Sequence, residues 1–365
     1  MLNNIARIKS HIKPAKIIIA CLILLTVLSL SSIYSSLHQA GQLQEQEIFY
    51  KEIMWVVISW IILILFYLLN YRIYFDFAYV LYAINICLLI AVDLFGRSAL
   101  GAQRWLSIGG FNFQPSELSK IITIFFLARI FSSQTDKGFL KGVLLPFFVL
   151  MINVLLIVKQ PDLGTALVLV FLFFLMGLAS GNKKRYFMAI IIAAIVFSPF
   201  AWNHLKDYQK KRLIVFLNPN AEPLGAGYTI IQSKIAIGSG KFLGKGFLSG
   251  TQNQFNFLPE RHTDFIFTVI AEEWGFAGAT MLLLIYLLVI NNILAVARYQ
   301  KDNFAQLLLI GMASLFFIHV FINIGMTLGI LPVVGIPLLF ISYGGTHLLV
   351  SFMLLGIFFN IYRHD

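Results

Sequence analysis

Charged residues are scarce in this sequence. Only 12% of its 365 residues are Asp, Glu, Lys or Arg, whereas 59% are hydrophobic. A soluble globular domain carries about 25% charged residues, so the composition indicates a membrane protein. No long hydrophilic block interrupts the apolar segments, which leaves no room for a separate soluble domain. We therefore predict one polytopic membrane domain over residues 1–365.

Cysteine is also rare. The chain has two, Cys21 and Cys87, and both fall inside apolar segments. Two isolated thiols provide neither a disulfide framework nor the ligand spacing of a metal site. We expect neither thiol to be functional.

Hydrophobic runs long enough to cross a bilayer, about 17 to 25 residues each, recur along the whole chain. The predicted spans are 15–35, 52–70, 74–94, 116–131, 142–159, 164–180, 187–202, 265–296, 304–329 and 346–362. Backbone polar groups find no water in lipid, so the spans must be helices, and none has the alternating pattern of a barrel strand. The predicted fold class is all-α, with about ten transmembrane helices.

Lysine and arginine are distributed unevenly between the predicted loops. The inner segments hold Arg7, Lys9, Lys13, Lys16, Arg72, Lys137, Lys141, Lys183, Lys184, Arg185, Arg298, Lys301 and Arg363, and the short outer loops hold Lys51, Arg97, Arg104 and Lys159. Because cytoplasmic loops carry the excess of basic residues, both termini are predicted to be cytoplasmic. Topology thus explains much of the net charge of +11 without a nucleic-acid partner.

A long outer segment, residues 203–264, lies between predicted helices 7 and 8. Its basic residues are Lys206, Lys210, Lys211, Arg212, Lys234, Lys241, Lys245 and Arg261. Long loops escape the charge rule, so this basicity suits an anionic ligand or phospholipid head groups. The apolar spacing over residues 230–237 predicts a short amphipathic helix that lies either in the head groups or on the bundle as a lid.

Three predicted outer helix starts each carry a carboxylate. Glu117 lies three residues before Lys120, Asp162 follows Lys159 in a tight turn, and Asp264 ends the polar stretch "ERHTD". A carboxylate in the first helical turn can simply cap the helix, for about 0.3 to 1 kcal/mol. Three of them at one membrane face, with basic residues nearby, instead favour a shared polar cavity.

Such a cavity would suit an anionic lipid-linked substrate. Cationic side chains hold phosphates, and a carboxylate can take a proton from an attacking hydroxyl. A helix N-terminus and a lysine partner would lower the pKa of the carboxylate, whereas a general base works best with a pKa near the operating pH. Apolar burial acts in the opposite direction, so the sequence leaves both outcomes open.

Four motifs occur in order along the chain: "GAQRWLSIGGFNFQPSELSK" (101–120), "KQPDLGTAL" (159–167), "QSKIAIGSGKFLGKGFLSGTQNQFNFLPERHTDFIFTVIAEEWG" (232–275) and "GILPVVGIPLLFISYGG" (329–345). Together they resemble the SEDS family of shape, elongation, division and sporulation proteins. The resemblance covers nearly the whole chain and is closer to the RodA branch than to the FtsW branch. It implies a peptidoglycan glycosyltransferase that polymerises lipid II outside the cytoplasmic membrane for cell elongation. The implied partners are a class B penicillin-binding protein and the elongation complex.

The resemblance also implies roles for individual residues. Asp264 matches the position of a general base that acts on the 4-hydroxyl of the acceptor sugar. Lys120, with Glu117, is implied as a salt-bridge partner of Asp264 and a diphosphate contact. The other implied substrate-binding residues are Arg104, Trp105, Lys159, Asp162, Arg261, His262 and Ser342. From position alone, an isolated tryptophan such as Trp105 is typical of an interfacial aromatic belt, and Ser342 could shape a turn.

Other functions fit the same sequence. An FtsW-like septal polymerase is one, and a lipid II flippase is another, although a transporter needs coupling groups at the bilayer midplane. A non-catalytic scaffold for a penicillin-binding protein would tolerate neutral replacement of Asp264. Mg²⁺ or Mn²⁺ could assist the diphosphate leaving group, but the sequence shows no dedicated metal-ligand cluster. No other cofactor is predicted.

Overall fold

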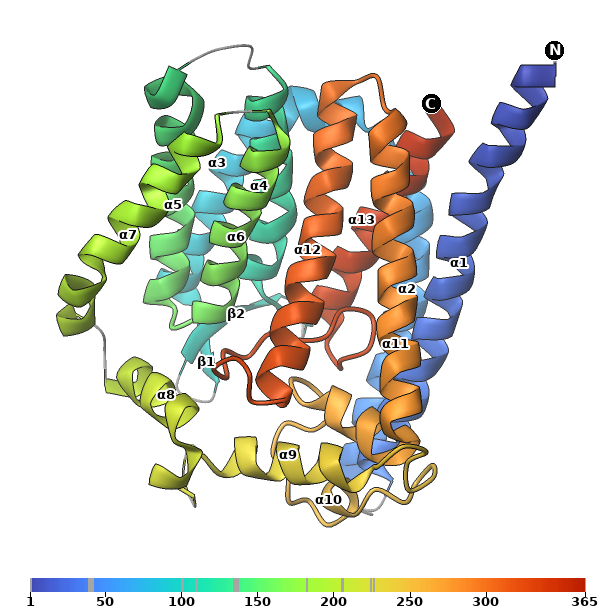
Figure 1. Cartoon of the computed structure of the whole chain (residues 1–365), viewed down its shortest axis with the longest axis vertical. Helices are drawn as coiled ribbons and strands as arrows, with labels where there is room; N and C mark the ends of the chain where they lie inside the picture. The colour runs from blue at the N-terminus through green and yellow to red at the C-terminus, as the bar shows by residue number, and fades with distance from the viewer. Residues whose placement is uncertain are drawn as a thin grey trace.

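The computed structural model describes residues 2–38, 43–99, 102–108, 111–133, 138–181, 183–204, 207–223, 225 and 227–364. Lys137 and Lys206, which contribute to the predicted orientation and loop charge, lie outside these residues. The chain forms a bundle of long helices (Figure 1). Both chain ends lie at one end of the bundle, and a small sheet and several short helices lie at the other.

Ten helices of the described chain coincide with the ten predicted spans. They are α1 (Leu2–Leu37), α2 (Leu43–Leu68), α3 (Arg72–Phe95), α4 (Pro115–Ser132), α5 (Leu145–Lys159), α6 (Leu163–Ala179), α7 (Lys184–His204), α11 (Ile266–Tyr299), α12 (Asn303–Thr327) and α13 (Gly345–His364). A π-helical turn, η1 (Leu140–Leu144), leads into α5. Within the described residues, seven spans are long and apolar enough to cross a membrane, and α6 is a shorter apolar helix. The helical multi-pass fold is confirmed, and ten crossings stay a prediction.

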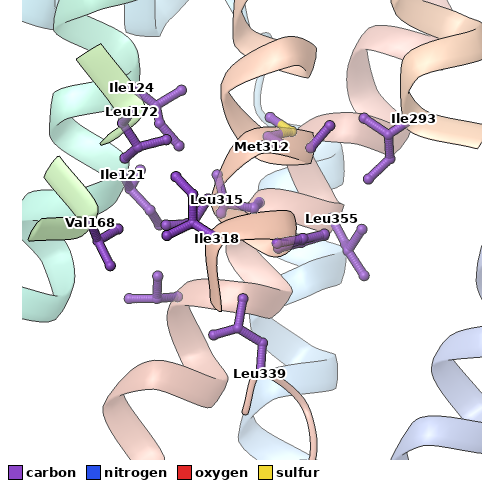
Figure 2. Close-up of a cluster of buried hydrophobic side chains, with 14 of the residues drawn as sticks. Ile121, Ile124, Val168, Leu172, Ile293, Met312, Leu315, Ile318, Leu339 and Leu355 are labelled. Carbon is purple, nitrogen blue, oxygen red and sulfur yellow. The ribbon is translucent and has the colours of Figure 1, made fainter. Parts of the chain in front are cut away.

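The core of the bundle is built around α12. This helix packs against α4, α6 and α11, while α13 packs against α2. Figure 2 shows apolar side chains from α4, α6, α11 and α13 gathered around Met312, Leu315 and Ile318 of α12. Gly311 permits the close approach, because a Cβ there would lie 2.6 Å from Ile124 Cγ2. Burial of most of its side chains makes α12 a rigid reference for the elements that it contacts.

A three-stranded antiparallel sheet lies in the connection between α3 and α4. Its strands are β1 (Arg97–Ala99), β2 (Ala102–Ile108) and β3 (Phe111–Phe113), in the order β1-β2-β3. Gln103 Nε2 donates to Gly96 O at 2.9 Å, which ties β2 to the end of α3. The sheet was not predicted, because the segment was interpreted only as a loop between spans. It matters for the site because β2 carries Arg104 and Trp105.

The long segment between α7 and α11 contains short helices: α8 (Asp207–Leu217), η2 (Pro219–Ala221), α9 (Tyr228–Ser239) and α10 (Thr251–Gln254). Helix α9 confirms the helix predicted over residues 230–237. It packs against α11 and α12 through Ile230, Ser233 and Ala236, and Ser233 Oγ donates to Thr327 O at 2.5 Å. Of the two predicted placements, α9 therefore lies on the bundle. The division into one domain with a loop at 203–264 stays a prediction.

Candidate active site at one end of the bundle

Asp264 lies in the turn that leads into α11. The backbone carbonyls of residues 262–264 each accept one hydrogen bond from a distant part of the chain. The donors are Tyr343 N at 2.8 Å, Ser342 Oγ at 2.7 Å and Asn323 Nδ2 at 2.9 Å. The turn is thus held by α12 and by the loop that precedes α13, and Ser342 has the turn-shaping role that was one of its predicted alternatives.

Asp264 is half-buried, and its carboxylate lies close to the backbone of the loop before α13. Gly335, with φ of +73°, lies next to it, and a Cβ at this position would come within 3.3 Å of Asp264 Oδ2. The N-cap of α11 is Phe265 and makes no side-chain cap bond. Among the described residues, the half-buried carboxylate forms no hydrogen bond or ion pair. Asp264 is therefore not a helix cap, and both of its oxygens are available to a ligand.

Burial raises the pKa of Asp264 to about 7, with further increases from the negative charges of Glu260 and Asp162. The positive charges of Arg104 and Arg212 act in the opposite direction and are weaker than burial. The sequence left open whether local charge lowers this pKa or apolar burial raises it. In the structure burial outweighs the positive charges, so the pKa of Asp264 is raised. A carboxyl group with a pKa near 7 can exchange a proton at neutral pH.

Asp162 connects the starts of two helices. Its Oδ1 accepts a hydrogen bond from Thr165 N at 3.2 Å, which makes it the N-cap of α6. Its Oδ2 accepts from Ser116 Oγ at 3.0 Å and from Gln114 Nε2 at 3.2 Å, both at the start of α4. The capping interpretation is confirmed for Asp162, and the same carboxylate ties α4 to α6.

Arg104 holds the turn before α6 from the side of the sheet. Its Nε donates to Gln160 O at 3.0 Å, and an Nη donates to Pro161 O. The start of α6 in turn packs against the loop beside Asp264, since a Cβ on Gly164 would lie 2.8 Å from Val334 O. The structure therefore brings the starts of α4, α6 and α11 to one end of the bundle, with Arg104 among them.

Lys120 and Glu117 form a separate, deeper pair. Lys120 Nζ lies 2.7 Å from Glu117 Oε1 and 3.2 Å from His319 Nε2. The predicted salt bridge between Lys120 and Asp264 is not formed in the described part of the chain. Lys120 is only 1% exposed, so its ammonium does not reach a ligand at the surface of the site. Helical spacing favours the observed pair, because residues i and i+3 lie on the same face.

The remaining predicted site residues differ in their placement. His262 packs edge-on against the Tyr343 ring, with centroids 5.7 Å apart, and burial lowers the pKa of His262. Arg261 Nε donates to Ser36 O of α1 at 2.7 Å. Lys159 is 72% exposed and pairs with Asp93 of α3 at 2.9 Å. Trp105 lies opposite Arg97 in the sheet and is half-buried. Lys159 and Arg261 thus point towards α3 and α1 in their described contacts.

Sequence reasoning missed three residues that shape the site. Asn323 and Gly335 contact Asp264 directly, and Glu260 acts on its charge. Asn323 carried a usable signal, because a strongly polar side chain within an apolar span is costly and usually has a bonded role. Gly335 carried a weaker one, as a single glycine between two prolines in "PVVGIP".

These features define a multi-pass helical membrane protein with a candidate acid–base site where several helices begin. Residues 15–365 match the FtsW/RodA/SpoVE family, whose members are described as cell cycle proteins. The chain belongs to this family.

Relatives share most of their length with this chain. It is 44% identical to the peptidoglycan glycosyltransferase MrdB of Escherichia coli K12, over 80% of each chain. It is 32% identical to the peptidoglycan glycosyltransferase RodA of Treponema pallidum, over 93% of this chain and 96% of the relative. Among solved structures, a chain of a peptidoglycan synthase complex that coordinates polymerization and crosslinking superposes with a TM-score of 0.81 at 30% identity, over 95% and 97% of the two chains. RodA of Thermus thermophilus gives 0.71 at 27% identity, over 95% of each.

Proposed function

We propose that this protein is a peptidoglycan glycosyltransferase that polymerises lipid II into glycan strands on the outer face of the cytoplasmic membrane, for cell elongation. The similarity to MrdB and RodA supports the reaction. The observation that carries the mechanism is the Asp264 carboxylate, which has no hydrogen-bond or ion-pair partner in the described part of the chain and whose pKa burial raises to about 7. The placement of both chain ends opposite the site (Figure 1) agrees with cytoplasmic termini and an outward-facing site.

In this mechanism Asp264 is the general base. Its carboxylate accepts the proton of the 4-hydroxyl of the acceptor sugar, and the oxygen attacks the anomeric carbon of the donor. The bond from that carbon to the diphosphate breaks, and the lipid diphosphate leaves with the electron pair. Arg104 uses two of its five N–H donors on the turn before α6, and the others can bind a phosphate. Asp264 then releases its proton to water.

The rate should follow the ionisation of Asp264. The deprotonated form is the active one, so the initial rate is expected to rise about tenfold per pH unit below about pH 7 and to level off above it. Initial rates of polymerisation of labelled lipid II between about pH 5 and pH 9 measure this dependence. A rate that is constant through the acidic half of this range would contradict Asp264 as the base.

Arg104 should also affect the pH at which Asp264 ionises. Its positive charge lowers the pKa of Asp264, so Arg104→Gln is expected to move the acidic inflection of the rate profile to higher pH and to lower the rate at pH 7 several-fold. Lys159→Gln is the matched control, because Lys159 is exposed and pairs with Asp93. An unchanged inflection in Arg104→Gln, or an equal shift in both variants, would show that Arg104 does not act on the base.

A class B penicillin-binding protein and the elongation complex are the proposed partners, supported by the similar chain within a peptidoglycan synthase complex.

A divalent cation has less support. Among the described residues, no group of three or more His, Cys, Asp and Glu gathers in a way that could hold a metal ion, and Asp162 already accepts bonds from Ser116, Gln114 and Thr165. The mechanism above assigns no step to a metal ion.

A further inference from the structure

Two polar side chains on the buried face of α12 lie one helical turn apart. His319 and Asn323 are both fully buried and both bond to the loop between α12 and α13. His319 Nδ1 lies 3.0 Å from Pro337 O, and Asn323 Nδ2 donates to Ile336 O at 2.8 Å. A buried polar group in a membrane bundle is costly unless it is bonded, so the two side chains have a specific task.

Asn323 also bonds to the backbone of the proposed base. Its Nδ2 donates a second hydrogen bond to Asp264 O at 2.9 Å, across 59 residues of sequence. Both neighbours are carbonyl oxygens, which accept only, so the NH2 group of the amide must face them. Asn323 Oδ1 has no partner among the described residues. The side chain therefore acts as a double donor that joins two segments of backbone.

The two joined segments are the ones that enclose the Asp264 carboxylate. One carries Asp264 itself. The other carries Ile336 and, next to it, Gly335, whose missing side chain leaves room for Asp264 Oδ2 at 3.3 Å from an added Cβ. The Asn323 amide thus fixes the distance between the Asp264 carboxylate and the backbone at Gly335. Helix α12, which supplies this amide, packs closely against α4, α6 and α11, so the position of the amide is fixed.

We propose that Asn323 is a positioning residue for glycosyl transfer, which fixes the Asp264 carboxylate over Gly335 by bonding the Asp264 and Ile336 carbonyls together. The proposal rests on the proposed function, in which Asp264 is the base. A base must lie within hydrogen-bond distance of the acceptor hydroxyl, and a displacement of about 1 Å can cost about a hundredfold in rate. Asn323 itself touches no substrate.

The chain provides a matched control at the opposite end of the bundle. Asn360 of α13 is as buried as Asn323, and it also makes two hydrogen bonds to backbone groups. It accepts from Tyr71 N at 2.9 Å and donates to Tyr67 O at 2.7 Å. Asn323→Leu and Asn360→Leu therefore remove equal numbers of buried hydrogen bonds with a similar change in volume. Only the first removes them from the site.

The test compares purified Asn323→Leu, Asn360→Leu and wild type for thermal unfolding and for polymerisation of labelled lipid II across pH. We expect both variants to lose similar thermal stability. Asn323→Leu is expected to lower kcat at least about tenfold with little change in KM. Its acidic inflection should move below about 7, because a loosened turn admits water to Asp264. Asn360→Leu should keep kcat and the inflection of the wild type.

Equal kcat values and inflections in the two variants would overturn the proposal. If either leucine variant does not fold, Asn323→Ser and Asn360→Ser give the same comparison, since a serine hydroxyl donates only one bond and is small. Asp264→Asn tests the role of Asp264 as the base separately from the positioning role of Asn323. Polymerisation by Asp264→Asn refutes Asp264 as the base, on which the positioning role rests, whereas an inactive Asp264→Asn beside Asn323 variants with unchanged kcat and inflection refutes only the positioning role.

Discussion

Asp264→Asn is expected to abolish polymerisation of lipid II, with a loss of at least about a hundredfold, because general base catalysis contributes about 10² to 10⁴ in rate. Asparagine keeps the shape of aspartate but cannot accept the proton of the acceptor hydroxyl. The carboxylate has no partner among the described residues that the substitution would orphan. The measurement is the yield of glycan polymer from labelled lipid II by the purified chain, with and without its penicillin-binding protein.

The fold of this variant should be intact. Because burial raises the folded-state pKa of Asp264 from 3.8 to about 7, ionisation of the carboxylate opposes folding, and this cost grows as pH rises from about 4 to 7. The neutral amide escapes the cost, so the thermal midpoint at pH 8 should not fall. Glu260→Gln is the comparison, since Glu260 is exposed, accepts a hydrogen bond from Thr263 Oγ1 at 3.0 Å and raises the pKa of Asp264 without being the base.

Each result for Asp264→Asn has a distinct meaning. Polymer formation that survives the substitution would exclude Asp264 as the base, and it would favour the scaffold role only if polymer forms solely in the presence of the penicillin-binding protein. Lipid translocation without any polymer, even from the wild type, would favour the flippase. Insensitivity of wild-type activity to moenomycin, an inhibitor of the other class of peptidoglycan transferases, would separate this activity from a contaminating enzyme.

Lys120→Met is expected to destabilise the fold by about 3 to 5 kcal/mol, because removing one partner of a buried ion pair leaves the other charge buried and uncompensated. The orphaned group is Glu117, which is 5% exposed and loses the ammonium 2.7 Å from its Oε1. Thermal unfolding in detergent measures the loss. The double variant with Glu117→Gln and Lys120→Met should recover much of the stability, because it no longer buries an unpaired charge.

An exposed ion pair of the same chain provides the control. Lys51 and Glu47 lie 3.2 Å apart with side-chain exposures of 56% and 69%, and exposed pairs contribute little to stability. Lys51→Met is therefore expected to leave the unfolding midpoint nearly unchanged. Equal, small effects of Lys51→Met and Lys120→Met would mean that Lys120 does not compensate a buried charge in the folded protein.

The fold could be predicted from the sequence to a large extent, because bilayer thickness fixes the length of each apolar segment and leaves the helix as its only conformation. The small sheet between α3 and α4 could not, since its strands are short and lie in a segment without a strong apolar pattern. Burial of α9 on the bundle depends on contacts with α11 and α12, which no local pattern contains.

The sequence indicated which residues belong to the site, but it did not indicate which of their side chains contact one another. Family motifs indicated Asp264, Asp162 and Arg104, which the structure brings to one end of the bundle. The salt bridge from Lys120 to Asp264 was predicted wrongly, although the i, i+3 spacing that favours Glu117 as the partner was visible in the sequence. The sign of the pKa shift of Asp264 depended on burial against local charge, and only three-dimensional placement decides that balance.

The hydrogen bonds that hold the turn at residues 262–264 also determine when, during synthesis of the chain, this turn can reach its final position. The ribosome adds their donors Asn323 and Ser342 well after the turn itself, 59 and 79 residues beyond the carbonyls that they bind. A nascent chain that has inserted α11 therefore carries Asp264 without the bonds that place it. The turn that carries Asp264 can therefore take its final position only after α12 and the loop before α13 have been synthesised.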